Sequence, residues 1–187
     1  SSSLLWTGSP EDAPPHLRRA RGVCHPDSAS DKSLSFLDLQ TMADDDFPHG
    51  RRYYAKSGYF TALDNQAIDR LLDAVATIPS SETIIELAYL GGAAAEVGAG
   101  DTAFGDRSAP IVLTLLANWT NPSDDAFHVS WARGIFERLR PAMKPGVYVN
   151  FMSGDEQSRV PEAYHQRWER MVAIKSHYDP QNFFRLN

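Results

Sequence analysis

The sequence predicts an α+β fold in which an antiparallel or mixed sheet carries helices on one face. At 187 residues and 42% hydrophobic content, the chain can bury a substantial core as one domain. Stretches with strand character alternate with two long stretches of helical periodicity. The strand-like stretches are 53–63, 83–90, 111–119 and 147–152, and the helical ones begin near residues 64 and 121.

The first fifty residues are rich in Ser, Pro and Asp, and we expect an irregular segment packed on the domain. Residues 4–7 could be the end of a strand, and 16–21 could form one or two helical turns. Residues 24–32 indicate a loop. Residues 34–42 predict a short strand or helix.

The first long helix is predicted to follow an aromatic-rich strand at 53–63. Asp64 can cap this helix through its side-chain oxygen. The expected buried row is spaced by three or four residues, and Pro79 ends the helix. The row consists of Ile68, Leu71, Leu72, Val75 and Ile78.

The second long helix is predicted to lie between two strands. Residues 111–119 are apolar almost throughout, as in a strand covered on both faces. The helix opens at 121–124 and ends at Pro141. Its apolar residues recur every four positions, so they share one buried face. These residues are Phe127, Trp131, Ile135 and Leu139.

The chain is predicted to end with a helix and an apolar tail. Tyr164, Trp168 and Val172 share one helix face, and we expect Trp168 and Val172 to be buried. Asp179-Pro180 stops the helix, because proline lacks an N–H and disfavours helical geometry in the preceding residue.

Several motifs resemble one known family. The last thirteen residues read K-x-x-Y-D-P-x-N-x-F-R-L-N, and they are similar to the closing segment of berberine bridge enzyme-like FAD-linked oxidases. Other motifs follow the family's order upstream. These are Arg51 to Tyr59 (similar to R-Y-x-K-S-G-Y), Leu90 to Ala93 (L-G-G-A), Thr102 to Arg107 (T-A-F-G-H-R, with Asp106 in place of histidine) and Tyr148 to Phe151 (Y-x-N-[YF]).

The resemblance implies that the chain is the C-terminal portion of such an oxidase. It implies a substrate-binding α+β domain at 51–160 and a berberine bridge enzyme-like helix and tail at 161–187. The family's FAD-binding domain lies largely N-terminal to this region, so it is the expected partner. We therefore expect FAD in the full-length protein and no tight FAD binding by this chain alone.

The expected reaction is oxidation of an alcohol or amine by hydride transfer to flavin, with O2 as acceptor. In this reading the fragment alone is inactive. The alternative is a non-catalytic α+β binding or interaction module that lacks flavin. An upstream flavin-binding domain in the full gene would distinguish the two.

Tyr148 is the first candidate catalytic residue, with Asn150 beside it on a predicted strand. Residues two apart on a strand point to the same face. A phenol can exchange a proton with substrate, and a carboxamide can donate to a flavin oxygen, so both are also candidate cofactor-binding residues. The alternative is that Tyr148 and Asn150 are partly exposed polar residues without a functional role. Phe151 departs from relatives with tyrosine there and cannot transfer a proton.

Glu86 is the second candidate catalytic residue, because it shares a predicted face with apolar neighbours. The alternative is an edge-strand glutamate facing water. Thr114 lies where some relatives carry a catalytic carboxylate, and threonine cannot serve as a base. Lys56 and Tyr59 are candidate substrate-binding residues, although Lys56 could equally be a solvated lysine.

Other features exclude functions. A net charge of −6 gives no basic footprint for nucleic acid, and no apolar run approaches the ~20 residues of a membrane span, which fits a soluble protein. The histidines lack metal-site spacing, and Cys24 is the single cysteine. Asp106 and Arg107 are expected to form a loop ion pair. The compartment stays open between cytoplasmic and secreted.

Overall fold

The computed structural model describes residues 5–22, 28, 30–98, 100–104 and 106–185. The chain forms two compact units, Ser1–Asp45 and Asp46–Asn187. The predicted loop at 24–32 lies largely outside the described residues, as do Leu4, Cys24 and His25. The packing of the first fifty residues on the domain stays a prediction.

Among its described residues the first unit carries the α-helices α1 (Ala13–Arg21) and α2 (Phe36–Thr41), with the 3-10 helix η1 (Pro10–Asp12) directly before α1. Both fall in stretches for which the sequence allowed helix, whereas residues 5–7 form no strand. The Ser35 hydroxyl accepts from the Asp38 N–H, and the Asp38 carboxylate accepts from the Ser35 N–H. This capping box satisfies amide groups that the start of α2 would otherwise leave unpaired.

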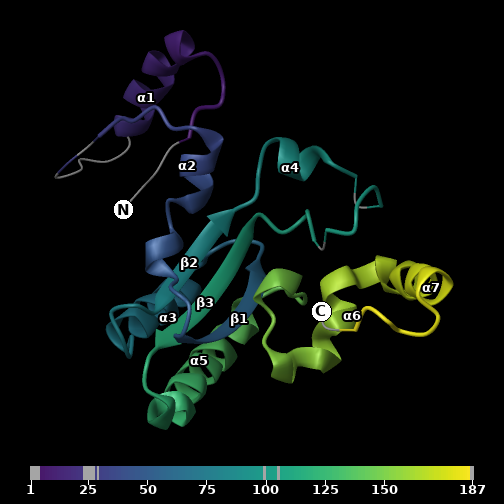
Figure 1. Cartoon of the computed structure of the whole chain (residues 1–187). Coiled ribbons are helices and arrows are strands. Elements are labelled where there is room, and N and C mark those ends of the chain that lie inside the picture. Colours follow the sequence, from purple (N-terminus) through teal and green to yellow (C-terminus); the bar gives the residue numbers. More distant parts are fainter. Residues whose placement is uncertain (1–4, 23–27, 29, 99, 105, 186–187) are drawn as a thin grey trace. The chain divides into compact units, whose positions relative to one another are not determined.

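The second unit holds the sheet and the remaining regular elements (Figure 1). The strands are β1 (Arg52–Phe60), β2 (Ile84–Tyr89) and β3 (Ile111–Trp119). The α-helices are α3 (Asn65–Ala76), α4 (Ala93–Glu96), α5 (Asp125–Leu139), α6 (Val160–Tyr164) and α7 (Trp168–Tyr178). Short 3-10 segments connect them, including η5 (Val149–Phe151), η6 (Gly154–Arg159) and η7 (His165–Arg167).

The three strands form an antiparallel sheet in the order β1-β3-β2. Phe60, Leu113 and Leu115 lie in one buried cluster with residues of α3 and α5, including Leu71 and Leu139. Both long helices therefore cover the same face of the sheet, which confirms the predicted α+β class.

The opposite face, which we call the second face, carries the alternate residues of each strand. The register places Ser57, Thr114 and Glu86 opposite one another in a row across β1, β3 and β2. The neighbouring row is Tyr59, Val112 and Ala88. These two rows position the candidate site.

The predicted buried row of α3 is wrong in part. Asp64 caps the helix as expected. The buried residues of α3 are Ala67, Leu71 and Ala74. Two alanines let the helix approach the sheet closely, so the side chains next to them on the helix turn outward. Ile68, Leu72 and Val75 are 41%, 62% and 52% exposed.

The predicted buried row of α5 is correct at Ile135 and Leu139 and wrong at Phe127, which is 62% exposed. Trp131 is partly buried. In the first turns His128 occupies the inward position instead. Its ring stacks on Trp119 with centroids 4.7 Å apart.

The predicted strand at 147–152 and the predicted burial of the last helix are also corrected. Residues 149–151 form a 3-10 turn. Before it, Lys144 makes an isolated bridge with Tyr59, and beyond that bridge serine hydroxyls hold the segment to β1. The last helix is interrupted at His165 (φ 49°) before α7 begins. None of the described residues of α7 is buried, and Val172 is 43% exposed.

Candidate functional site

The candidate site lies on the second face of the sheet, where the segment after Gly146 crosses β1. The Tyr148 side chain packs against the buried cluster of Tyr59, Ala109 and Val112. Tyr59 and Val112 belong to the second face. Tyr148 is therefore on the side of the sheet away from α3 and α5, although it is not on a strand.

Tyr148 is held from several directions. The Ser57 hydroxyl accepts from the Tyr148 N–H at 3.1 Å and donates to the Tyr148 carbonyl at 3.3 Å. Its ring packs against Phe104 and Phe151, with centroids 5.6 and 5.3 Å away. The Asn150 amide donates to its hydroxyl at 2.9 Å. Tyr148 is only partly buried, so its phenol is held in place and still accessible from solvent.

The Asn150 contact brings together two of the predicted site residues. Because the amide is the donor, the hydroxyl of Tyr148 can still give its own proton to another acceptor. Asn150 itself is exposed. The two residues are neighbours as expected, but a 3-10 turn brings them together and not the period of a strand.

Tyr59 belongs to the buried cluster against which Tyr148 packs, and it is 0% exposed. Burial, the largest cause, raises the pKa of its phenol to about 12, although the main chain of Asp106 acts in the opposite direction. Among the described residues its hydroxyl has no hydrogen-bond partner. Tyr59 is thus placed as a neutral buried group behind Tyr148.

Glu86 lies at the far end of the row that begins with Ser57. Thr114 separates them and is 3% exposed. Two strand spacings, about 10 Å, lie between Ser57 and Glu86. Glu86 is exposed on the edge strand β2, as in the alternative reading of a glutamate facing water. The two predicted catalytic residues share a face and are not in contact within the described structure.

Lys56 lies apart from Tyr59, on the opposite face of β1. Its ammonium group is 3.2 Å from Glu156 and 3.6 Å from Asp155, and the residue is 7% exposed. The two predicted substrate-binding residues are therefore not brought together. The solvated-lysine alternative is also wrong, because the side chain is buried in an ion-pair network.

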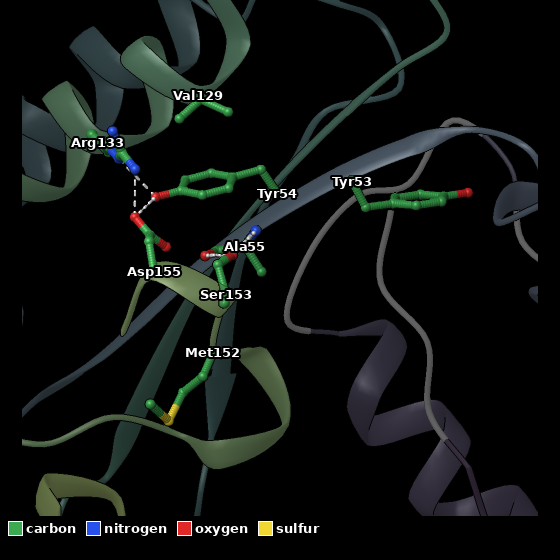
Figure 2. A pocket seen from close by; sticks show the side chains of 9 residues that line it. Tyr53, Tyr54, Ala55, Val129, Arg133, Met152, Ser153 and Asp155 are labelled. Carbon is green, nitrogen blue, oxygen red and sulfur yellow. Dashed lines mark hydrogen bonds and ion pairs between the residues drawn. The ribbon is translucent and has the colours of Figure 1, made fainter. Parts of the chain in front are cut away.

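Figure 2 shows part of this network in a pocket beside β1. The Tyr54 hydroxyl donates to Asp155 at 2.8 Å, and Arg133 donates to both Tyr54 and Asp155. Burial raises the pKa of Asp155, but the Tyr54 and Arg133 hydrogen bonds outweigh it and lower the pKa overall. Tyr53 points away to the other side of the strand (Figure 2).

Asp106 does not pair with Arg107, which corrects the sequence prediction. Its carboxylate is 2.5 Å from Lys144 and accepts from the Ser108 N–H and hydroxyl. Burial raises its pKa, but these contacts outweigh burial and bring the pKa to about 2. Arg107 donates to the Ala94 carbonyl and the Thr102 hydroxyl. The loop turns Asp106 inward and leaves Arg107 on the α4 side.

Sequence reasoning missed Ser57 and Phe104, which hold Tyr148. Ser57 lies inside the motif Arg51 to Tyr59, and Phe104 lies inside Thr102 to Arg107. The motifs therefore marked the right segments. The Ser57 contact with Tyr148 joins residues 91 positions apart, and the Phe104 contact also joins distant segments, so only the fold reveals them.

The chemistry of two described side chains is compatible with the ring of a flavin. Tyr148 and Asn150 offer a hydroxyl and an amide at the edge of an apolar cluster. The phosphate end of a dinucleotide needs a glycine-rich loop running into a helix N-terminus. Gly91 and Gly92 precede α4, which has only 4 residues. The described residues therefore suit the substrate side of a flavin and not its pyrophosphate.

The chain is also similar to known proteins. Residues 147–187, which contain Tyr148, Asn150 and all of α7, match the family model described as "Berberine and berberine like". The resemblance to the berberine bridge enzyme-like family is confirmed. Supporting sequence matches are to FAD-linked oxidoreductases.

Two curated relatives show how much of such a protein the chain spans. An FAD-linked oxidoreductase of Dictyostelium discoideum is 24% identical over 98% of this chain and 40% of its own length. The uncharacterised FAD-linked oxidoreductase YgaK of Bacillus subtilis is 29% identical over 86% of this chain and 36% of its own length. The chain thus spans well under half of these relatives.

Solved structures of this family share the fold. The BBE-like 1 protein of Physcomitrella patens matches 94% of this chain and 41% of its own chain, with a TM-score of 0.74 and 19% identity. Berberine bridge enzyme from Eschscholzia californica matches 71% of this chain and 31% of its own, with a TM-score of 0.64 and 19% identity.

Two negative observations concern the described residues alone. No helix among them has the length and apolar character to cross a membrane. Within the same ranges, no group of three or more His, Cys, Asp or Glu side chains is arranged to hold a metal ion.

Proposed function

We propose that this chain forms the substrate-facing part of an FAD-dependent oxidoreductase that oxidises an alcohol or an amine, with O2 as acceptor. The observation that carries the proposal is the fixed phenol of Tyr148. Its main chain, ring and hydroxyl are all held, while it remains partly exposed. A group held in this way loses little freedom when a substrate binds, which favours proton transfer.

In this proposal Tyr148 acts as its phenolate, which takes the proton of the substrate hydroxyl or amine and becomes a neutral phenol. The Asn150 amide stabilises the phenolate because it donates to the same oxygen. FAD, when bound, accepts the hydride from the adjacent carbon. Asn150 orients the phenol and is the residue best placed to meet the flavin edge. Glu86 is the second candidate base, because it is exposed on the same face of the sheet.

Tyr59 and Lys56 have different places in the proposal. Tyr59 is buried behind Tyr148, so it would shape the floor of a substrate site through its ring. Lys56 would meet an acidic substrate only if its contacts to Asp155 and Glu156 opened. A substrate role for Lys56 is therefore the less supported of the two.

Two solved structures with a similar fold support a small-molecule substrate. A glycopeptide hexose oxidase was solved with teicoplanin, with a TM-score of 0.62 and 21% identity. GilR, an oxidoreductase of the terminal step of gilvocarcin biosynthesis, was solved with pregilvocarcin, with a TM-score of 0.63 and 21% identity. By analogy, we propose a hydroxyl-bearing or amine-bearing small molecule as substrate here.

We also propose that a flavin-binding domain is the partner of this chain. The last helix and tail expose large apolar side chains that a stable fold normally covers. Val172, Tyr178, Phe183 and Phe184 are 43%, 80%, 78% and 73% exposed. Asp179 nevertheless holds the tail, because it accepts from the N–H groups of Phe183 and Phe184. An ordered apolar surface of this kind suits domain packing.

The test is to sequence the coding region upstream of Ser1 and to express the complete polypeptide. We expect a flavin-binding domain, a yellow protein and substrate-dependent O2 consumption with alcohols or amines. A complete polypeptide without bound flavin would overturn the proposal and favour the non-catalytic interaction module.

A further inference from the structure

We infer that Ser57 is the positioning residue for Tyr148, which rests on the function proposed above. One hydroxyl holds both main-chain groups of Tyr148, at 3.1 Å from its N–H and 3.3 Å from its carbonyl oxygen. Ser57 is 0% exposed. It lies in the rigid strand β1, opposite Thr114 of the central strand.

The contact replaces a fourth strand at this edge of the sheet. A paired strand would offer both an N–H and a carbonyl to its neighbour. Here the segment after Gly146 turns into η5 and offers no ladder, so a side chain takes that place. Four residues earlier the Lys144 N–H donates to the Tyr59 carbonyl at 2.8 Å, and the Ser57 hydroxyl is the contact that holds the main chain of Tyr148 itself.

The same edge contains a matched contact that does not involve Tyr148. The Ser153 hydroxyl accepts from the Ala55 N–H at 3.1 Å and donates to the Ala55 carbonyl at 2.8 Å. Each serine makes two such hydrogen bonds between β1 and the 146–153 segment. Ser57 lies on β1 and bonds the main chain of the segment, whereas Ser153 lies on the segment and bonds the main chain of β1. Ser153 is the natural control, since losing it costs the same kind of contact five residues further on.

Ser57 acts on catalysis only through Tyr148. Without the hydroxyl the backbone of Tyr148 is free to shift, while Phe104 and Phe151 still pack on its ring. A displacement near 1 Å of a reacting group lowers a rate by about 10²-fold. Because Ser57 is fully buried beneath the segment, it makes no contact with substrate itself.

The first test uses this chain alone. In Ser57→Ala, hydrogen exchange of the Tyr148 amide should accelerate about tenfold or more, as expected for a lost hydrogen bond. Ser153→Ala should leave that amide unchanged and accelerate the Ala55 amide instead. If Ser57→Ala does not fold, Ser57→Cys keeps the volume and weakens both bonds, because a thiol is a poor donor and acceptor. An unchanged Tyr148 amide in both variants would overturn the inference.

The second test uses the complete flavin enzyme and a double-mutant cycle. Ser57→Ala should slow flavin reduction by about 10- to 100-fold at unchanged FAD content, while Ser153→Ala changes it less than about threefold. In a Tyr148→Phe background, Ser57→Ala should have almost no further effect. A full additional loss there would show that Ser57 does not act through Tyr148. If Tyr148→Phe itself has no effect, the proposed function fails, and the amide-exchange result still decides the structural contact.

Discussion

The side-chain amide of Asn150 donates a 2.9 Å hydrogen bond to the phenolic oxygen of Tyr148. Tyr148 immediately precedes the 3-10 turn η5 and Asn150 lies within it, so the two side chains meet across the start of the turn. This contact fixes where the Tyr148 hydroxyl lies and leaves its proton free for another partner.

Replacing Tyr148 with phenylalanine should slow the reductive half-reaction of the complete enzyme by about 10²–10⁴-fold, the usual contribution of a positioned acid or base. FAD content should stay the same, because the ring still packs on Phe104 and Phe151. Stopped-flow measurement of flavin reduction checks this. A near wild-type rate would remove Tyr148 from the mechanism and make Glu86 the leading candidate base.

The chain by itself should bind no FAD tightly. Its described residues suit the substrate side of a flavin, and the Gly91-Gly92 turn leads only into the short helix α4. The purified chain should be colourless after incubation with FAD and gel filtration. A stoichiometric yellow cofactor that survives this step would contradict the expectation.

Replacing Asp106 with asparagine should cost about 2 kcal/mol of unfolding free energy near pH 7. The folded pKa of Asp106 lies near 2, below the ordinary 3.8, because Lys144 and Ser108 outweigh burial. A carboxyl with a lowered pKa stabilises the fold fully above its unfolded pKa and loses this effect as the pH falls through its folded pKa. The cost should therefore be constant above about pH 5 and fall by about half near pH 3.

Urea unfolding of the parent and Asp106→Asn from pH 3 to pH 7 measures this difference. Asp73→Asn, at an exposed position of α3, serves as the control and should change stability by less than about 0.5 kcal/mol. A cost for Asp106→Asn that does not depend on pH would show that the Lys144 pair is not its cause.

Replacing Trp168 with alanine should cost only about 1–2 kcal/mol in this chain. A fully packed tryptophan would cost about 3–5 kcal/mol. Trp168 is partly buried and stacks mainly on Tyr164, with ring centroids 6.1 Å apart. Leu113→Ala, at a fully buried position of the central strand, should cost about 2–5 kcal/mol in the same denaturation experiment. If Trp168→Ala proves as costly as Leu113→Ala, α7 is docked more firmly than its exposure indicates.

Replacing Lys56 with methionine should destabilise the chain by about 2–4 kcal/mol. It removes a buried partner of Glu156, which is 3% exposed and keeps Arg159 at 2.5 Å. Glu156 then stays buried with Arg159 but without the Lys56 charge, which costs less than leaving a buried carboxylate wholly unpaired. Arg140→Gln, which breaks an exposed pair with Glu137, should change stability by less than about 1 kcal/mol. Unchanged stability with a raised KM in the complete enzyme would instead support substrate contact by Lys56.

The sequence by itself determined the fold class, the three strands at 53–63, 83–90 and 111–119, both long helices and the berberine bridge enzyme-like resemblance. These features follow from local periodicity, capping and motif order, which need no knowledge of distant contacts. The cap at Asp64 is an example, because its partner is three residues away.

Only the tertiary structure decided which side chains meet. It exposed Phe127 and buried His128, separated Lys56 from Tyr59, and paired Asp106 with Lys144 instead of its neighbour Arg107. It also turned the expected strand at 147–152 into a 3-10 segment held by Ser57 and Ser153. The physical reason is that the deciding contacts join distant parts of the chain, such as Asp106 with Lys144, 38 positions apart, and Ala55 with Ser153, 98 positions apart. No local pattern encodes such contacts.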